Sequence, residues 1–156
     1  AFDELFLHFA EPAAWRLEDS AGYVFNHLIR RGLRLGIASN FDARLRPVLA
    51  GFSDLHPLLD AVVISSEVGV RKPGRAFFAA VAGRMNEPAN RTAFVGDDRA
   101  NDYDGADAAG FFTVLLDSDN RHPDVARRIA TLADLVRVTP EPSPSARRRR
   151  SGARRR

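Results

Sequence analysis

The sequence contains no cysteine, and lysine occurs once, at Lys72. Without cysteine the chain can form no disulfide framework, thiolate nucleophile or cysteine-ligated zinc site, so its chemistry must use oxygen and nitrogen groups. No segment approaches the ~18 uninterrupted apolar residues that a membrane helix requires, and no basic start followed by an apolar run indicates a secretory signal. We therefore expect a cytoplasmic protein without a membrane partner.

Basic residues are concentrated at the C-terminal end. Residues 139–156 contain seven Arg and one Glu, which leaves residues 1–138 with 16 of the 23 basic and 19 of the 20 acidic residues. This last segment is rich in Pro, Ser and Arg, buries little apolar surface and repels itself, so we expect it to be disordered. Clustered arginines attract polyanions by counterion release, so the tail gives nucleic acid only a nonspecific binding surface.

The rest of the chain has the composition of a single soluble domain, with 45% hydrophobic and 28% charged residues over the 156 positions. Short apolar runs alternate with helical patterns, and runs that are apolar on both faces indicate a parallel sheet covered by helices on each side. The spacing predicts strands over 33–38, 61–64, 92–95 and 112–116. It predicts helices over 20–31, 43–49, 75–85 and 102–109.

The N-terminal residues also follow the helical period, with Phe2, Leu5, Phe6 and Phe9 on one face before Pro12. The sequence opens on Ala1 rather than methionine and enters this pattern at once. We expect a chain that lacks its natural beginning.

Polar residues follow three of the four predicted strands, where ligands bind in open α/β sheets. Ser39-Asn40 follows the first strand, Lys72 follows the second, and Asp97 to Asp102 follow the third. A hydroxyl can hydrogen-bond phosphate oxygens and a lysine can offset phosphoryl charge. Closely packed carboxylates indicate a bound cation, and Mg²⁺ suits carboxylate oxygen and phosphate best.

Three segments carry a resemblance to a known family: LGIASN at 35–40, SSEVGVRKPG at 65–74 and VGDDRANDYDGADAAG at 95–110. In order and spacing they resemble the second, third and fourth motifs of the haloacid dehalogenase (HAD) superfamily, in a form similar to its subfamily IA. The resemblance covers about 33–117. It implies a Rossmann-like three-layer core over 32–138, with 1–31 similar to the end of the helical cap.

The resemblance also implies roles for individual residues. Ser39 would donate to the phosphoryl group with Asn40 beside it, and Lys72 would bind that group and steady the charge of the nucleophile. Asp97 would ligate Mg²⁺, and Asp102 would support the metal shell or pair with Lys72. The Gly-Asp step at 96–97 favours the magnesium-dependent phosphohydrolases over the metal-free dehalogenases of the family, with a small phosphorylated substrate and an aspartyl-phosphate intermediate.

The first motif of that family, an Asp-x-Asp after an apolar strand, is absent before Leu33. By resemblance, its strand lies at the sheet centre, between the strands that end at Ser39 and Asp97. We therefore expect unpaired backbone groups on both neighbours, a poorly stable isolated chain, and no catalysis without an aspartate from elsewhere.

Three alternatives stay open. Asp117-Ser-Asp119 also follows an apolar strand, but its use as the nucleophile would require a permuted fold. The aspartates at 97, 98 and 102 could cap a helix, and Asp98 receives no catalytic role. The chain could also be a catalytically silent phosphate-binding or interaction protein whose contact is the basic tail.

Overall fold

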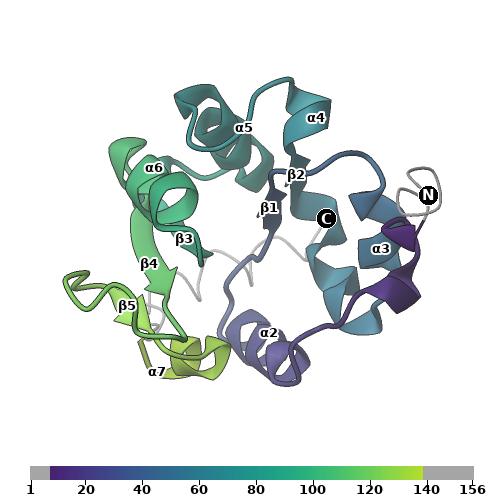
Figure 1. The fold of residues 1–156 in the computed structure, drawn as a ribbon, viewed down its shortest axis with the longest axis horizontal. Coiled ribbons are helices and arrows are strands. Elements are labelled where there is room, and N and C mark those ends of the chain that lie inside the picture. Colours follow the sequence, from purple (N-terminus) through teal and green to yellow (C-terminus); the bar gives the residue numbers. More distant parts are fainter. Residues whose placement is uncertain (1–7, 139–156) are drawn as a thin grey trace, which may run out of the picture.

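The computed structural model describes residues 8–138, which form an α/β structure of short parallel strands with helices around them (Figure 1). The expected fold class, a parallel α/β core, is confirmed. The strands are β1 (Ile37–Ser39), β2 (Val62–Ile64), β3 (Ala93–Gly96), β4 (Phe112–Leu116) and β5 (Arg128–Ile129). The α-helices are α2 (Ala21–Arg30), α3 (Leu45–Ala50), α4 (Ser65–Val68), α5 (Arg75–Met85), α6 (Gly105–Ala108) and α7 (Leu135–Val138).

Tighter or wider helical turns complete the chain. They are 3₁₀ segments η1 (Pro12–Ala14), η2 (Ser53–Ala61), η3 (Ala89–Arg91) and η5 (Leu132–Asp134), and a π-helical segment η4 (Arg99–Asp104).

The strands divide into two separate parallel sheets, β1-β2 and β3-β4-β5. In the first sheet Ala38 aligns with Val63, and in the second Val95 aligns with Val114. Among the described residues, β1 pairs only with β2 and β3 only with β4, so each of these two strands has one edge without a strand partner. The open edge of β1 lies opposite the open edge of β3 near the centre of the molecule (Figure 1).

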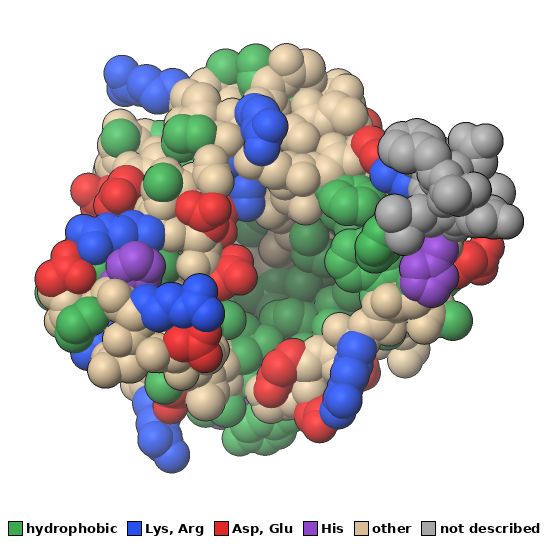
Figure 2. Space-filling model, in the orientation of Figure 1, with side chains coloured by type: hydrophobic (Ala, Val, Ile, Leu, Met, Phe, Trp, Pro, Cys, Tyr) green, Lys and Arg blue, Asp and Glu red, His purple; other side chains and the backbone are tan. Residues whose placement is uncertain are grey.

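Burial is lowest in the two strands that border this central gap. All three residues of β1 are half-buried, whereas all three of β2 are buried. Val95 and Gly96 of β3 are half-buried, whereas the middle of β4 is buried. An inner strand of a parallel sheet is ordinarily covered on both faces and both edges. Figure 2 shows a central hollow with hydrophobic walls in this region, as the missing central strand predicts.

The buried apolar residues form three clusters rather than one. The first joins α5 to β3 through four aromatic rings, in which Phe78 contacts Phe77, Phe94 and Phe111 with ring centroids 5.3 to 5.8 Å apart. The second packs Val24 and Leu28 of α2 on β4 and β5. A third joins α3 and η2 to β2. The first cluster also contains Val63 of β2, so apolar packing around α5 connects the two sheets where no strand pairing does.

The predicted helix over 75–85 and strand over 112–116 are confirmed at both ends, and α2 lies one residue inside its predicted limits at each end. The strand predicted over 33–38 is wrong in position, because β1 begins only at Ile37. The preceding residues are drawn away from the sheet: Leu33 is exposed, and Arg34 donates to the carbonyl of Met85 at 2.7 Å.

The helix predicted over 102–109 is also wrong at its start, since helical structure begins at Arg99. Asp98 caps this earlier start, because its Oδ1 accepts from the backbone N–H of Asn101 at 2.8 Å. The helix predicted over 43–49 is displaced by one to two residues and runs from Leu45 to Ala50.

Two predictions about the chain ends lie outside the described residues: most of the helix over 2–9, and the disordered tail over 139–156. The assignment of 1–31 to a cap region stays a prediction. Within residues 8–138, no helix is both long and apolar enough to cross a bilayer.

The open edges predict uneven protection of the backbone. Alternate N–H groups along β1 point to β2 and into the gap, whereas those of β4 lie between two partner strands. We expect the amides of Val114 and Leu115 to exchange with deuterium at least about tenfold more slowly than the slowest amide of β1. Hydrogen exchange measured by NMR tests this, and equal protection of the β1 and β4 amides would contradict the open edge of β1.

Candidate active site at the strand ends

Lys72 and Asp102 form a buried ion pair that joins the two sheets. Lys72 lies in the loop between α4 and α5, and Asp102 lies in η4, the first helical segment after β3. The Lys72 ammonium donates to Oδ1 of Asp102 at 2.5 Å, and the two side chains are 11% and 6% exposed. Removing one partner of such a pair costs about 3–5 kcal/mol, because the other charge stays buried without compensation.

The Lys72 ammonium group has two further neighbours, one in each sheet. Its second contact is the carbonyl of Ala38 in β1, at 3.5 Å, and the ring of Phe94 in β3 lies 5.6 Å away. The ammonium thus lies between the first sheet and the second, at the ends of β1 and β3. Its three N–H donors have two protein acceptors here, so one remains for a ligand.

Asn40 fixes the loop that carries Lys72. Its side-chain amide donates to the carbonyl of Lys72 at 3.1 Å, and its Oδ1 accepts from the backbone N–H of Lys72 at 2.8 Å. These two bonds connect the end of β1 to a position 32 residues later. The structure therefore gives Asn40 a positioning contact in addition to the predicted substrate contact, which stays a prediction.

Gly96 allows Asp102 to reach its place. A Cβ atom at position 96 would lie 2.3 Å from Oδ2 of Asp102 and 2.4 Å from its Cγ, far inside van der Waals contact. Oδ2 accepts from the backbone N–H of Asp98 at 3.1 Å, so both carboxylate oxygens of Asp102 are engaged. Gly105 has a similar role, because a Cβ there would lie 2.8 Å from Pro73, next to Lys72.

Asp98 is occupied by its helix-capping contacts. Its two carboxylate oxygens accept from the backbone N–H and the side-chain amide of Asn101, at 2.8 and 2.7 Å. These two bonds, with a smaller contribution from the charge of Lys72, hold the pKa of Asp98 below its usual value. The capping interpretation thus applies to Asp98 and leaves Asp97 and Asp102 for other roles.

The remaining predicted site residues lie at the same ends of the strands. Ser39 is the last residue of β1 and is half-buried, and Asp97 directly follows β3 and is exposed. Within residues 8–138, neither side chain has a recorded hydrogen bond. In the same range, no three acidic, His or Cys side chains cluster closely enough to hold a metal ion by themselves.

Asp117, from the alternative Asp-x-Asp segment, makes structural contacts in the turn after β4. Its side chain is buried and accepts from the backbone N–H groups of Arg121 and His122 at 2.8 and 3.0 Å, which closes the turn after β4. Burial tends to raise the pKa of Asp117, but these bonds outweigh it, and the pKa lies below its usual value. The carboxylate of Asp119 pairs with Arg121 at the surface.

The fold and these residues define an α/β protein that presents a hydroxyl, an ammonium group and carboxylates at the ends of parallel strands, as phosphate-handling hydrolases do. A family model described as haloacid dehalogenase-like hydrolase matches residues 4–110. The chain therefore belongs to the haloacid dehalogenase-like hydrolase family.

Sequence similarity to known proteins supports this family assignment. The chain is 36% identical over 115 residues to haloacid dehalogenase-like hydrolase domain-containing protein 3 of Mus musculus, covering 73% of this chain and 45% of that protein. It is 33% identical over 94 residues to pyrimidine 5'-nucleotidase YjjG of Escherichia coli K12, covering 60% and 42%. The chain thus spans about half the length, or less, of these curated relatives.

A solved structure has the same fold. The HAD phosphatase of Thermococcus onnurineus superposes with a TM-score of 0.79 at 22% identity, over 90% of this chain and 65% of that one.

The close approach of Gly96 to Asp102 predicts the effect of one methyl group. In Gly96→Ala the new Cβ forces the Asp102 carboxylate away from Lys72, so we expect a loss of about 3–5 kcal/mol in the free energy of unfolding. Urea denaturation followed by circular dichroism measures it. Gly83→Ala is the matched control, since nothing lies within 4 Å of a Cβ at this helical position and the change should be neutral or stabilising. Equal urea midpoints for the two variants would contradict the dependence of the Lys72–Asp102 pair on glycine at position 96.

Proposed function

We propose that this chain is the phosphate-binding part of a Mg²⁺-dependent phosphomonoester hydrolase that acts on small phosphorylated substrates. Its nucleophile, an aspartate, would come from a strand outside this chain. The observation that carries the proposal is the buried Lys72–Asp102 pair, which lies at the ends of β1 and β3 beside the gap between them. Family membership and phosphatase-named relatives support the hydrolase class.

The charge of the site supports a divalent cation. Asp97, Asp98 and Asp102 carry three negative charges against the single positive charge of Lys72. A phosphate dianion would be repelled by this balance unless a cation joined it. Within residues 8–138 the Asp97 carboxylate forms no hydrogen bond or ion pair, so it would hold Mg²⁺ together with water and phosphate oxygens. When bound, the ion would neutralise charge on the phosphoryl oxygens.

The residues of this chain would bind and orient the phosphoryl group. The hydroxyl of Ser39 would donate to one phosphoryl oxygen, and the free N–H of the Lys72 ammonium would donate to another. An oxygen of the first aspartate of the external Asp-x-Asp would attack phosphorus while the bond from phosphorus to the alcohol oxygen breaks, and the second acid of that motif would give its proton to the leaving alcohol. Water would then attack the aspartyl phosphate and lose a proton to the second carboxylate, which releases inorganic phosphate and restores both acids.

The gap supports an external nucleophile. Backbone groups on the facing edges of β1 and β3 need partners, and one parallel strand would supply both edges at once. Its carboxyl end would lie beside Lys72, because all the strands end on the same side of the sheet. An aspartate there would face Lys72, Ser39 and Asp97 together.

Peptide complementation tests this proposal. An apolar peptide of about ten residues ending in Asp-x-Asp should bind the 156-residue chain and confer Mg²⁺-dependent hydrolysis of p-nitrophenyl phosphate, measured by nitrophenolate absorbance. The first aspartate is the nucleophile, so its change to asparagine should abolish turnover and leave binding intact. Lys72→Met in the chain should lower the rate by about 10² or more. Tight binding of the peptide without any turnover would refute the proposal.

The basic residues of 139–156, set apart from the slightly acidic residues 1–138, favour a second candidate, a catalytically silent protein that binds polyanions. The expected result is then salt-sensitive DNA binding that disappears when residues 147–156 are deleted, measured by fluorescence anisotropy. Phosphatase activity of the pure chain would exclude this candidate, as would DNA binding that survives the deletion.

A further inference from the structure

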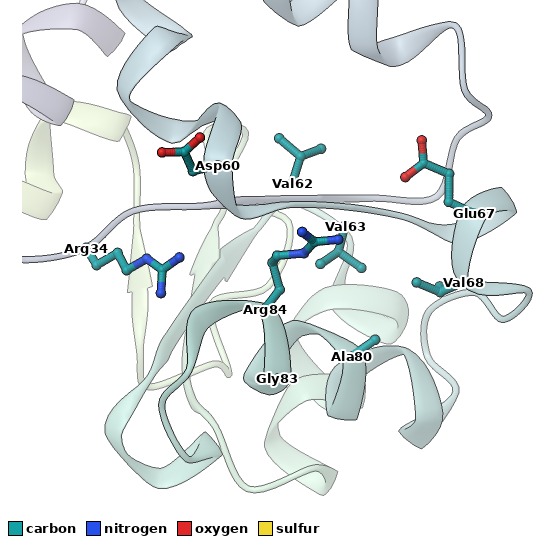
Figure 3. A pocket seen from close by; sticks show the side chains of 9 residues that line it. All are labelled: Arg34, Asp60, Val62, Val63, Glu67, Val68, Ala80, Gly83 and Arg84. Carbon is teal, nitrogen blue, oxygen red and sulfur yellow. The ribbon is translucent and has the colours of Figure 1, made fainter.

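A cavity lies at the outer edge of β2 (Figure 3), and none of the Lys72 site residues lines it. Its volume is about 540 Å³, within the usual range for small-molecule sites. β2 ends its two-stranded sheet, so among the described residues this edge has no strand partner. Four charged side chains line the cavity from four segments: Arg34, Asp60, Glu67 and Arg84.

The two arginines lie on the same side of β2, beside α5, and both guanidinium groups extend into the cavity in Figure 3. One N–H of Arg34 donates to the carbonyl of Met85 at 2.7 Å, which fixes its guanidinium across the end of α5. Arg84 is in the last turn of the same helix, and within residues 8–138 it has no recorded hydrogen bond. Two like charges in one cavity repel each other unless an anion lies between them.

The two carboxylates do not cancel this charge. Glu67 is held by Arg46, with N–O distances of 2.6 and 2.6 Å from Nε and Nη2. The hydrogen bonds from Arg46 keep the pKa of Glu67 below its usual value, with a smaller electrostatic effect from Arg84. Asp60 lies across the β2 ribbon from both arginines in Figure 3. The α5 side of the cavity is therefore positively charged.

We propose that this cavity binds the oxyanion of a small molecule, a phosphate or a carboxylate group, between Arg34 and Arg84. The planar fork of a guanidinium matches both groups with two parallel hydrogen bonds. Ala80 and Val68 supply an apolar wall for the rest of the ligand. This site shares no residue with the Lys72 site and does not depend on the proposed hydrolase function.

NMR titration of the full chain with inorganic phosphate, and separately with citrate, tests the proposal. We expect saturable shifts of the amides of Val63, Ala80 and Arg84, with affinity reduced at least about tenfold in Arg34→Met and in Arg84→Met. Arg91→Met is the matched control. This substitution removes the same charge from an exposed position on η3, outside the cavity, and should leave the affinity unchanged. Phosphate shifts at Ser39 or Asp97 report on the Lys72 site separately, so each proposal can fail alone.

A further variant covers the case in which a methionine substitution unfolds the chain. Arg84→Lys keeps the charge but removes the fork, so it should weaken binding of both probes by a smaller factor than Arg84→Met. The proposal is overturned if the cavity amides show no saturable shift. Equal affinity in wild type, Arg84→Lys and the Arg91 control would overturn it as well.

Discussion

The ion pair between Lys72 and Asp102 is the buried polar contact that joins the ends of the two sheets, and the candidate site depends on it. Lys72 is attached to the β1-β2 sheet through its contacts with Ala38 and Asn40, and Asp102 is attached to the second sheet through η4. No strand pairing crosses between β1 and β3 in the described residues. Polar contacts therefore replace the backbone ladder at the strand ends, while the apolar cluster around Phe78 joins Val63 of β2 to Phe94 of β3.

This arrangement makes the gap the central constraint on stability. A two-stranded sheet is marginal by itself in water, whereas a three-stranded sheet packed against helices can be stable. Apolar side chains that would be covered by a central strand stay half-buried, among them Ile37 in β1 and Val95 in β3. Each such side chain contributes only part of the ~1.5–3 kcal/mol that its full burial would add to the free energy of unfolding. A strand in the gap would supply hydrogen bonds and burial together.

Segments with strong local patterns could be predicted from the sequence. The helix 75–85 and the strand 112–116 have clear apolar patterns and turn residues at their ends, and they were predicted at their true limits. The start of β1 could not be predicted, because Leu33 and Leu35 have the apolar character of a strand and only the distant contact of Arg34 with Met85 moves them away. The early start of η4 depends on which of three neighbouring aspartates acts as the cap.

For the candidate site, the residue types could be predicted and their contacts could not. Two roles were open for Asp102, and its contact with Lys72 is set by the absence of a side chain at Gly96, which no spacing argument indicates. The double hydrogen bond between Asn40 and the backbone of Lys72 joins positions 32 residues apart. The arginines of the β2 cavity give no sequence signal at all, since they are two among 22 and become neighbours only when α5 packs beside the segment before β1.

The single lysine of the chain occupies a place that arginine could not fill equally well. Its ammonium must approach Oδ1 of Asp102, the carbonyl of Ala38 and the face of Phe94 at one point, and a compact charge with three donors can do this. A guanidinium spreads five donors over a plane, so two oxygen acceptors and one ring face around this point would leave several of its donors buried without partners. Such donors cost about 1–3 kcal/mol each, which is enough to offset the ion pair itself. The geometry of this buried contact therefore accounts for lysine at position 72 in a chain that otherwise uses arginine for its positive charge.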